Sequence, residues 1–143
     1  MNNEVAIVYW SGTGNTEAMA KLVASGVAKA GGSSRLFTAD SFDSSMVASY
    51  SKIALGCPAM GVESLEDSVF QPMYDSIRTS LSGKVVGLFG SYGWGDGEWM
   101  RNWQEDVVAA GAKLATEPVT VLGSAEGDDA EVCVGLSKAL CSD

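Results

Sequence analysis

Short apolar runs alternate along the chain with longer stretches in which apolar residues recur every three or four positions. The runs at residues 5–10 and 52–57 are continuously apolar, as expected of central strands that are covered on both faces. Further strands are predicted at residues 34–38 and 84–90, and at 113–116 continued by 119–122. Pro118 between the last two pieces indicates that they belong to an edge strand.

The stretches with helical spacing predict amphipathic helices between these strands. One helix follows Thr16 and ends near Ala30; others are predicted at residues 70–81, 98–110 and 129–140, with a short helix or turn near 46–50. Strands that alternate with helices are typical of a parallel, doubly wound α/β sheet, in which ligands bind beyond the carboxyl ends of the strands. With 143 residues and no linker or internal repeat, we expect a single domain covering residues 1–143.

A glycine-rich segment, Ser11-Gly12-Thr13-Gly14-Asn15-Thr16, joins the first predicted strand to the first helix. Its amides and short hydroxyl side chains can donate hydrogen bonds to an anion at the helix N-terminus. No Lys or Arg occurs between residues 1 and 20, which excludes a nucleotide triphosphate loop of the Walker type. Glu17 replaces the third glycine of a dinucleotide fingerprint, so that motif is a poor match as well. Two interpretations remain: a loop that holds a phosphate, and an ordinary turn capped by Ser and Thr.

Two more loops are expected at the same edge of the sheet. Residues 58–66 follow the third strand and contain Met60, whereas residues 91–97 follow the fourth and combine three glycines with Tyr92 and Trp94. Trp and Met can cover the faces of an aromatic ligand, and glycine lets the backbone approach its edge. The two loops therefore predict a slot for a planar ring beside the phosphate.

Composition limits the chemistry that these loops can carry. Histidine is absent, which removes the commonest general base and transition-metal ligand, so we expect a cofactor rather than a catalytic residue or a metal to carry any chemistry. The formal charge of −9 opposes binding to nucleic acid or to an anionic membrane. The three cysteines form no C-x-x-C pair and no apolar run is long enough to span a membrane, which favours a soluble cytoplasmic protein with free thiols.

Three motifs together resemble the short-chain flavodoxins of clostridia and related anaerobes. They are residues 9–16 (YWSGTGNT), residues 57–61 (CPAMG) with Glu63, and residues 91–95 (SYGWG) with Trp99-Met100. The resemblance covers essentially the whole chain. It implies a flavodoxin-like fold with five parallel strands in the order 2-1-3-4-5 and helices on both faces. It also implies one non-covalently bound flavin mononucleotide (FMN) and a function as a low-potential one-electron carrier that substitutes for ferredoxin.

The resemblance further assigns roles to individual residues. It places the FMN phosphate on residues 11–16 and the flavin ring between Trp94 and Met60, with Glu63 accepting a hydrogen bond from ring N3–H. Two departures from the family pattern are Pro58, where some relatives have Ser, and the lack of an Asn after the last strand. The implied cofactor-binding residues are Ser11, Gly12, Thr13, Gly14, Asn15, Thr16, Pro58, Ala59, Met60, Gly61, Glu63, Ser91, Tyr92, Gly93, Trp94 and Gly95.

The resemblance implies a monomer that exchanges electrons with soluble, ferredoxin-type redox proteins through an acidic surface around the flavin. The acidic residues in or beside the ring loops, without nearby Lys or Arg, are expected to lower the reduction potential. A flavin-dependent reductase on the same fold is one alternative, but a short chain without histidine and a ring covered on both faces leave little room for a hydride donor. A phosphorelay receiver domain shares the fold class but needs an acidic cluster after the first strand, which is missing here.

Overall fold

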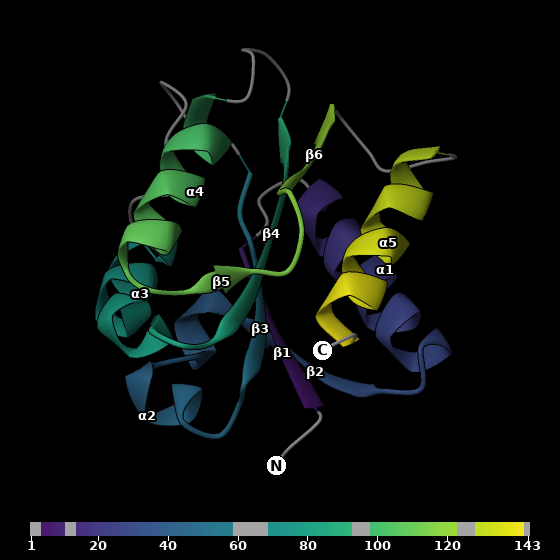
Figure 1. The fold of residues 1–143 in the computed structure, drawn as a ribbon. Helices are drawn as coiled ribbons and strands as arrows, with labels where there is room; N and C mark the ends of the chain where they lie inside the picture. The colour runs from purple at the N-terminus through teal and green to yellow at the C-terminus, as the bar shows by residue number, and fades with distance from the viewer. Residues whose placement is uncertain (1–3, 11–13, 59–68, 93–97, 123–127, 142–143) are drawn as a thin grey trace.

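The computed structural model describes residues 4–10, 14–58, 69–92, 98–122 and 128–141 (Figure 1). Its strands are β1 (Glu4–Tyr9), β2 (Ser33–Thr38), β3 (Lys52–Gly56), β4 (Val85–Tyr92), β5 (Lys113–Leu114) and β6 (Val119–Leu122). Its α-helices are α1 (Asn15–Lys29), α2 (Ser44–Val47), α3 (Phe70–Ile77), α4 (Glu98–Ala109) and α5 (Asp128–Cys141). Two 3-10 turns, η1 (Ala39–Ser41) and η2 (Arg78–Leu81), complete the described elements.

All strand pairs of the sheet are parallel, and the strand order is β2-β1-β3-β4-β5, with β6 also pairing with β4. The predicted order 2-1-3-4-5 is therefore confirmed. β5 and β6 occupy the same edge in succession, because Lys113 pairs opposite Val85 and Val119 opposite Phe89. The predicted interruption of the edge strand is thus confirmed, with Pro118 between its two pieces.

Helices cover the sheet on both faces, α1 and α5 on one face and α2, α3 and α4 on the other (Figure 1). Along β1, Val5 and Ile7 pack in the cluster with α1 and α5, whereas Ala6 and Val8 pack in the opposite cluster. All four side chains have no exposed surface, which is why β1 shows a continuous apolar run instead of alternation. β3 lies beside β1 and β4 beside β3, and because all three strands are parallel their carboxyl ends lie at one edge of the sheet.

Several predicted bounds change in the structure. Asn15 and Thr16, expected in the loop, form the first turn of α1, and Ser91 and Tyr92, also expected in a loop, are the last residues of β4. The helix predicted at 70–81 continues beyond Ile77 only as the 3-10 turn η2. The ends of helices and strands differ from the predicted ones because backbone N–H and C=O groups form hydrogen bonds wherever the adjacent turn or strand supplies a donor or acceptor.

The three cysteines are free thiols, of which Cys57 and Cys133 are buried and Cys141 is half-buried. No helix in the described parts of the chain combines the length and apolar character needed to cross a membrane.

Candidate cofactor site at the carboxyl edge of the sheet

The carboxyl ends of β1, β3 and β4 lie side by side. Tyr9 is in register with Gly56, and Gly56 with Phe89. The ladder continues one residue further, because Trp10 N–H donates to the Gly56 carbonyl at 3.0 Å and Cys57 N–H to the Phe89 carbonyl at 3.1 Å. The three predicted loops therefore start from adjacent positions, as the sequence predicted.

The structure describes only some of the predicted cofactor-binding residues. Gly14, Asn15 and Thr16 lie at the start of α1, Pro58 follows β3, and Ser91 and Tyr92 end β4. The remaining predicted residues lie outside the described parts of the chain, namely Ser11, Gly12, Thr13, Ala59, Met60, Gly61, Glu63, Gly93, Trp94 and Gly95. Their roles remain predictions.

The N-terminus of α1 begins at Gly14, which has a φ of 95° and a ψ of −11°. This left-handed conformation is natural for glycine and strained for residues with a side chain. As N-cap, Gly14 contributes no side-chain hydrogen bond to the first turn of the helix. Ser11 and Thr13, the residues of the predicted turn that precede Gly14, lie outside the described parts of the chain, so both interpretations of this segment remain predictions. A helix start whose N-cap has no side chain is compatible with an anion such as a phosphate group.

A buried pair of hydroxyls connects the start of α1 to the end of β4. Thr16 Oγ1 and Ser91 Oγ are 3.1 Å apart, and both residues are almost fully buried. Only one of the two hydroxyl hydrogens is used between them, so the pair can still donate one hydrogen bond. Residues predicted for the phosphate loop and for the ring loop are thus brought together, although they are 75 positions apart in the chain.

Trp99, which the sequence indicated only beside the third motif and not as a cofactor-binding residue, also lies at this edge. Its Nε1–H donates to the Cys57 carbonyl at 3.2 Å. The centroid of its ring lies 5.6 Å from the centroid of the Tyr92 ring, and the interplanar angle is 48°. The available signal was chemical: a buried tryptophan usually finds a hydrogen-bond partner for its indole nitrogen. The sequence could not identify that partner.

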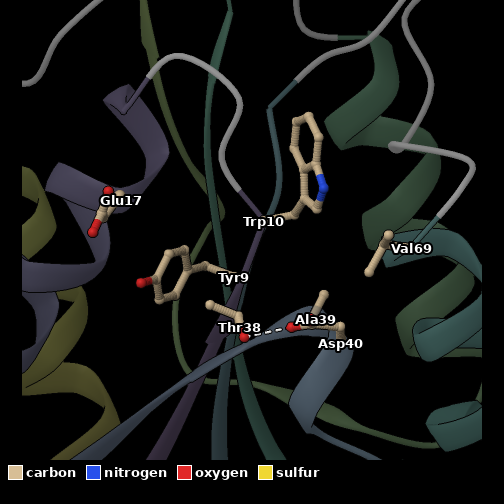
Figure 2. A pocket seen from close by; sticks show the side chains of 7 residues that line it. All are labelled: Tyr9, Trp10, Glu17, Thr38, Ala39, Asp40 and Val69. Atoms are coloured by element: carbon tan, nitrogen blue, oxygen red, sulfur yellow. Dashed lines mark hydrogen bonds between the residues drawn. The ribbon is translucent and has the colours of Figure 1, made fainter.

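A pocket of about 330 Å³ opens beside the site, on the β2 side of β1 (Figure 2). Glu17 and Asp40 give it two carboxylates, and Thr38 Oγ1 donates to Asp40 Oδ1 at 2.5 Å. No sequence motif indicated this pocket, because it forms where the ends of neighbouring strands meet. The described residues that line it are Tyr9, Trp10, Glu17, Thr38, Ala39, Asp40 and Val69. Its two carboxylates, with no basic group among these lining residues to offset them, would repel a phosphate, so the pocket itself is not suited to one.

Among the described residues, no group of three or more His, Cys, Asp or Glu side chains could hold a metal ion. The fit to an organic cofactor rests on the glycine-capped start of α1 and the adjacent strand ends.

Comparison with known proteins places this arrangement in a family. The flavodoxin family model matches residues 7–136. A flavodoxin from Megasphaera elsdenii is 47% identical over 139 residues, covering 94% of this chain and 96% of that protein. A flavodoxin from Clostridium beijerinckii is 42% identical over 137 residues, covering 95% of this chain and 98% of that protein.

Solved structures agree with the sequence comparison. The solution structure of two-electron reduced Megasphaera elsdenii flavodoxin superposes with a TM-score of 0.86 at 45% identity, covering 96% of this chain and 98% of that chain. A Streptococcus pneumoniae flavodoxin gives a TM-score of 0.84 at 26% identity, with 96% of this chain covered and 97% of that chain. The family model, the identities and the strand order agree, and the chain belongs to the flavodoxin family of FMN-binding electron-transfer proteins.

Proposed function

We propose that this chain, as one domain, holds a single FMN at the carboxyl ends of β1, β3 and β4 and carries electrons at low potential between soluble redox proteins, in place of a ferredoxin. The observation that supports this site most directly is the start of α1 at this edge, where the N-cap is a glycine without a side chain and an anion can accept hydrogen bonds from helix amides. Bound FMN supplies the redox chemistry, because it can take up and release electrons one at a time. The protein binds it and sets its potential.

The phosphate would lie against the amides and hydroxyls of residues 11–16, where Thr16 is already fixed by Ser91. The flavin ring would lie between Met60 and Trp94, with Glu63 at N3–H. Pro58, Ala59 and Tyr92, and the glycines at 61, 93 and 95, would complete the walls. These assignments extend the family pattern to this chain, and the described strand ends support them because they start all three segments at one edge.

Electrostatics around the site favours a low potential. Glu98 begins α4 at this edge and is exposed, and by sequence Glu63, Glu66, Asp67 and Asp96 belong to the segments after β3 and β4. A unit negative charge about 10 Å from a reduced, anionic flavin costs about 0.4 kcal/mol at water-like screening. That energy corresponds to about 20 mV for a one-electron step, so several such charges together lower the potential appreciably.

The distribution of charge also supports docking of a basic redox partner at the same edge. Among the basic residues, only Lys21 and Arg101 lie within the first two turns of helices that start at the carboxyl edge. The others lie at strand starts or near helix ends, toward the amino edge: Lys29, Arg35, Lys52, Arg78, Lys84, Lys113 and Lys138. A basic partner would therefore be attracted to the flavin edge and repelled from the opposite one. We further propose a cytoplasmic monomer, since free thiols suit a reducing compartment.

Substitution of Gly14 tests the proposed phosphate site. Gly14→Ala places a side chain in left-handed backbone, which costs about 1–2 kcal/mol and distorts the start of α1. Gly31→Ala is the matched control, because Gly31 has a φ of 90° beyond the other end of the same helix and neither site crowds an added Cβ. Both variants should lose similar stability to urea, but only Gly14→Ala should raise the Kd for FMN, by about tenfold. Equal Kd values for the two variants would contradict the proposed phosphate site.

A further inference from the structure

Trp99 connects the two segments that are expected to contact the flavin ring. It is the second residue of α4 and is 2% exposed. Its indole N–H reaches the carbonyl of Cys57, which stands just before residues 59–68. Its ring lies against Tyr92, which stands just before residues 93–97. One side chain thus contacts the residue directly before one ring segment and the second residue before the other.

Both backbone polar groups of Cys57 are hydrogen-bonded. Its N–H donates to the Phe89 carbonyl at 3.1 Å, and its carbonyl accepts from Trp99 at 3.2 Å. The space for this arrangement depends on Gly90, because a Cβ there would lie 2.2 Å from the Cys57 oxygen and 3.1 Å from Trp99 Cζ2. A side chain at position 90 would therefore clash with the Cys57 carbonyl, and relief of the clash would move that carbonyl out of its position against the indole.

We propose that Trp99 is a positioning residue for FMN, which fixes the starting point of the 59–68 segment relative to the 93–97 segment. This inference rests on the proposed function, because it assumes that both segments contact the ring. Trp99 need not contact FMN itself. Because these starting points are fixed, less conformational freedom is lost when FMN binds. The two contacts of Trp99 therefore contribute to FMN affinity through preorganisation.

A pair of tryptophan variants tests the role of the indole. Trp99→Phe keeps an aromatic ring but removes the N–H that holds the Cys57 carbonyl. Trp103→Phe is the control: Trp103 lies one turn further along α4, is 3% exposed and packs edge-on against Phe70 and Tyr74. Its Nε1 has no hydrogen-bond partner among the described residues, so the control removes a similar volume without breaking a hydrogen bond there.

The measurements use the FMN-loaded proteins. The Kd is obtained by dilution, which releases FMN and restores its fluorescence, and the visible circular dichroism of bound FMN reports the surroundings of the ring. We expect Trp99→Phe to raise the Kd about five- to tenfold and to change the visible dichroism. Trp103→Phe should leave the Kd within about twofold and the dichroism unchanged, although both variants lose stability to urea. If both variants lose stability but bind FMN with the same Kd and dichroism as the unmodified protein, the role of Trp99 is only structural and the inference is wrong.

A pair of glycine variants reaches the same contact without changing the indole. Gly90→Ala should displace the Cys57 carbonyl and weaken FMN binding as Trp99→Phe does. Gly87→Ala, on the same strand, would place its Cβ nearest to side-chain atoms of Leu136, at 2.8 Å, and Leu140, at 3.4 Å, and should leave the Kd unchanged. Equal Kd values for these two variants would also contradict the inference. Failure of the unmodified protein to bind FMN would instead overturn the proposed function, so the two outcomes are distinguishable.

Discussion

At the scale of single residues, three polar side chains join α3 to α4. Tyr74 Oη donates to Asp106 Oδ2 at 2.6 Å, and Arg78 Nε donates to the same oxygen at 2.8 Å. The hydrogen bond from Arg78 is the main reason that the pKa of Asp106 is below its ordinary value of 3.8, and burial opposes it. Burial is the main reason that the pKa of Tyr74 is raised, so this phenol remains a neutral donor.

Asp106 therefore predicts a pH dependence of stability. The pKa of Asp106 is lower in the folded protein than in the unfolded chain. Its contribution to the free energy of unfolding is therefore complete at pH values above the unfolded pKa and disappears as the pH falls through the folded pKa. Asp106→Asn should lower the free energy of unfolding by about 1 kcal/mol at pH 7, because the carboxylate is partly exposed and screened. Urea unfolding at a series of pH values should show this difference shrinking below about pH 4.

Asp75→Asn is the control for this prediction. Asp75 is exposed on α3 and accepts a local hydrogen bond from Gln71, which is 2.9 Å long and lies within one helix. Its replacement should change stability by less than about 0.5 kcal/mol. A constant difference between Asp106→Asn and the unmodified protein at every pH would contradict the assignment.

At the scale of secondary-structure elements, α1 and α5 pack closely on one face of the sheet. Ser137 Oγ on α5 donates to the Val23 carbonyl on α1 at 2.6 Å. A Cβ on Gly26 would lie 2.5 Å from that same Oγ. The absence of a side chain at position 26 therefore allows the two helices to approach and form the hydrogen bond. Because α1 starts at the proposed phosphate site, this packing also supports its N-terminus.

This contact predicts that replacing Gly26 by alanine destabilises the protein, whereas helix propensity alone would predict stabilisation. Gly26→Ala would normally favour a helix by about 1 kcal/mol, but the clash with Ser137 should destabilise the protein by about 1–3 kcal/mol. Gly135→Ala on α5 has no atom within 4 Å of the added Cβ and should be neutral or stabilising. Urea unfolding of both variants compares the two effects. A more stable Gly26→Ala protein would show that the helices can separate without loss.

Much of the arrangement of helices and strands could be predicted from the sequence. The continuous apolar runs identify β1 and β3 as buried on both faces, and Pro118 marks the interrupted edge, because local chemistry determines both features. The contacts that shape the site could not be predicted in the same way. Trp99 and Cys57 are 42 positions apart and Thr16 and Ser91 are 75 apart, so only the folded topology brings them together.

At the scale of the whole molecule, the uneven distribution of charge should govern encounters with partners. The net charge is −9, and most basic residues lie toward the amino edge of the sheet, away from the proposed flavin site. Attraction between charged surfaces accelerates encounter and weakens as salt screens it. The rate of electron transfer to a basic acceptor protein should therefore fall as ionic strength rises.

A matched pair of double variants localises this effect. Asp40→Asn with Glu98→Gln removes two exposed charges at the carboxyl edge and should reduce the salt dependence measured by stopped-flow spectroscopy. Glu4→Gln with Asp75→Asn removes the same charge away from that edge, since Glu4 starts β1 and Asp75 lies in the second half of α3. The control should retain nearly the full salt dependence. An identical response of the two double variants would indicate that net charge alone, and not a docking edge, controls the rate.

The central claim, that FMN bound at this edge carries single electrons, is tested most directly by stepwise anaerobic reduction of the purified protein. Absorbance spectra recorded at controlled potentials show how many electrons enter at each step. We expect a yellow protein that is reduced in two separate one-electron steps. The second step should occur at low potential because of the surrounding acidic residues. Reduction in one two-electron step, or a protein that neither carries nor binds FMN, would contradict the claim.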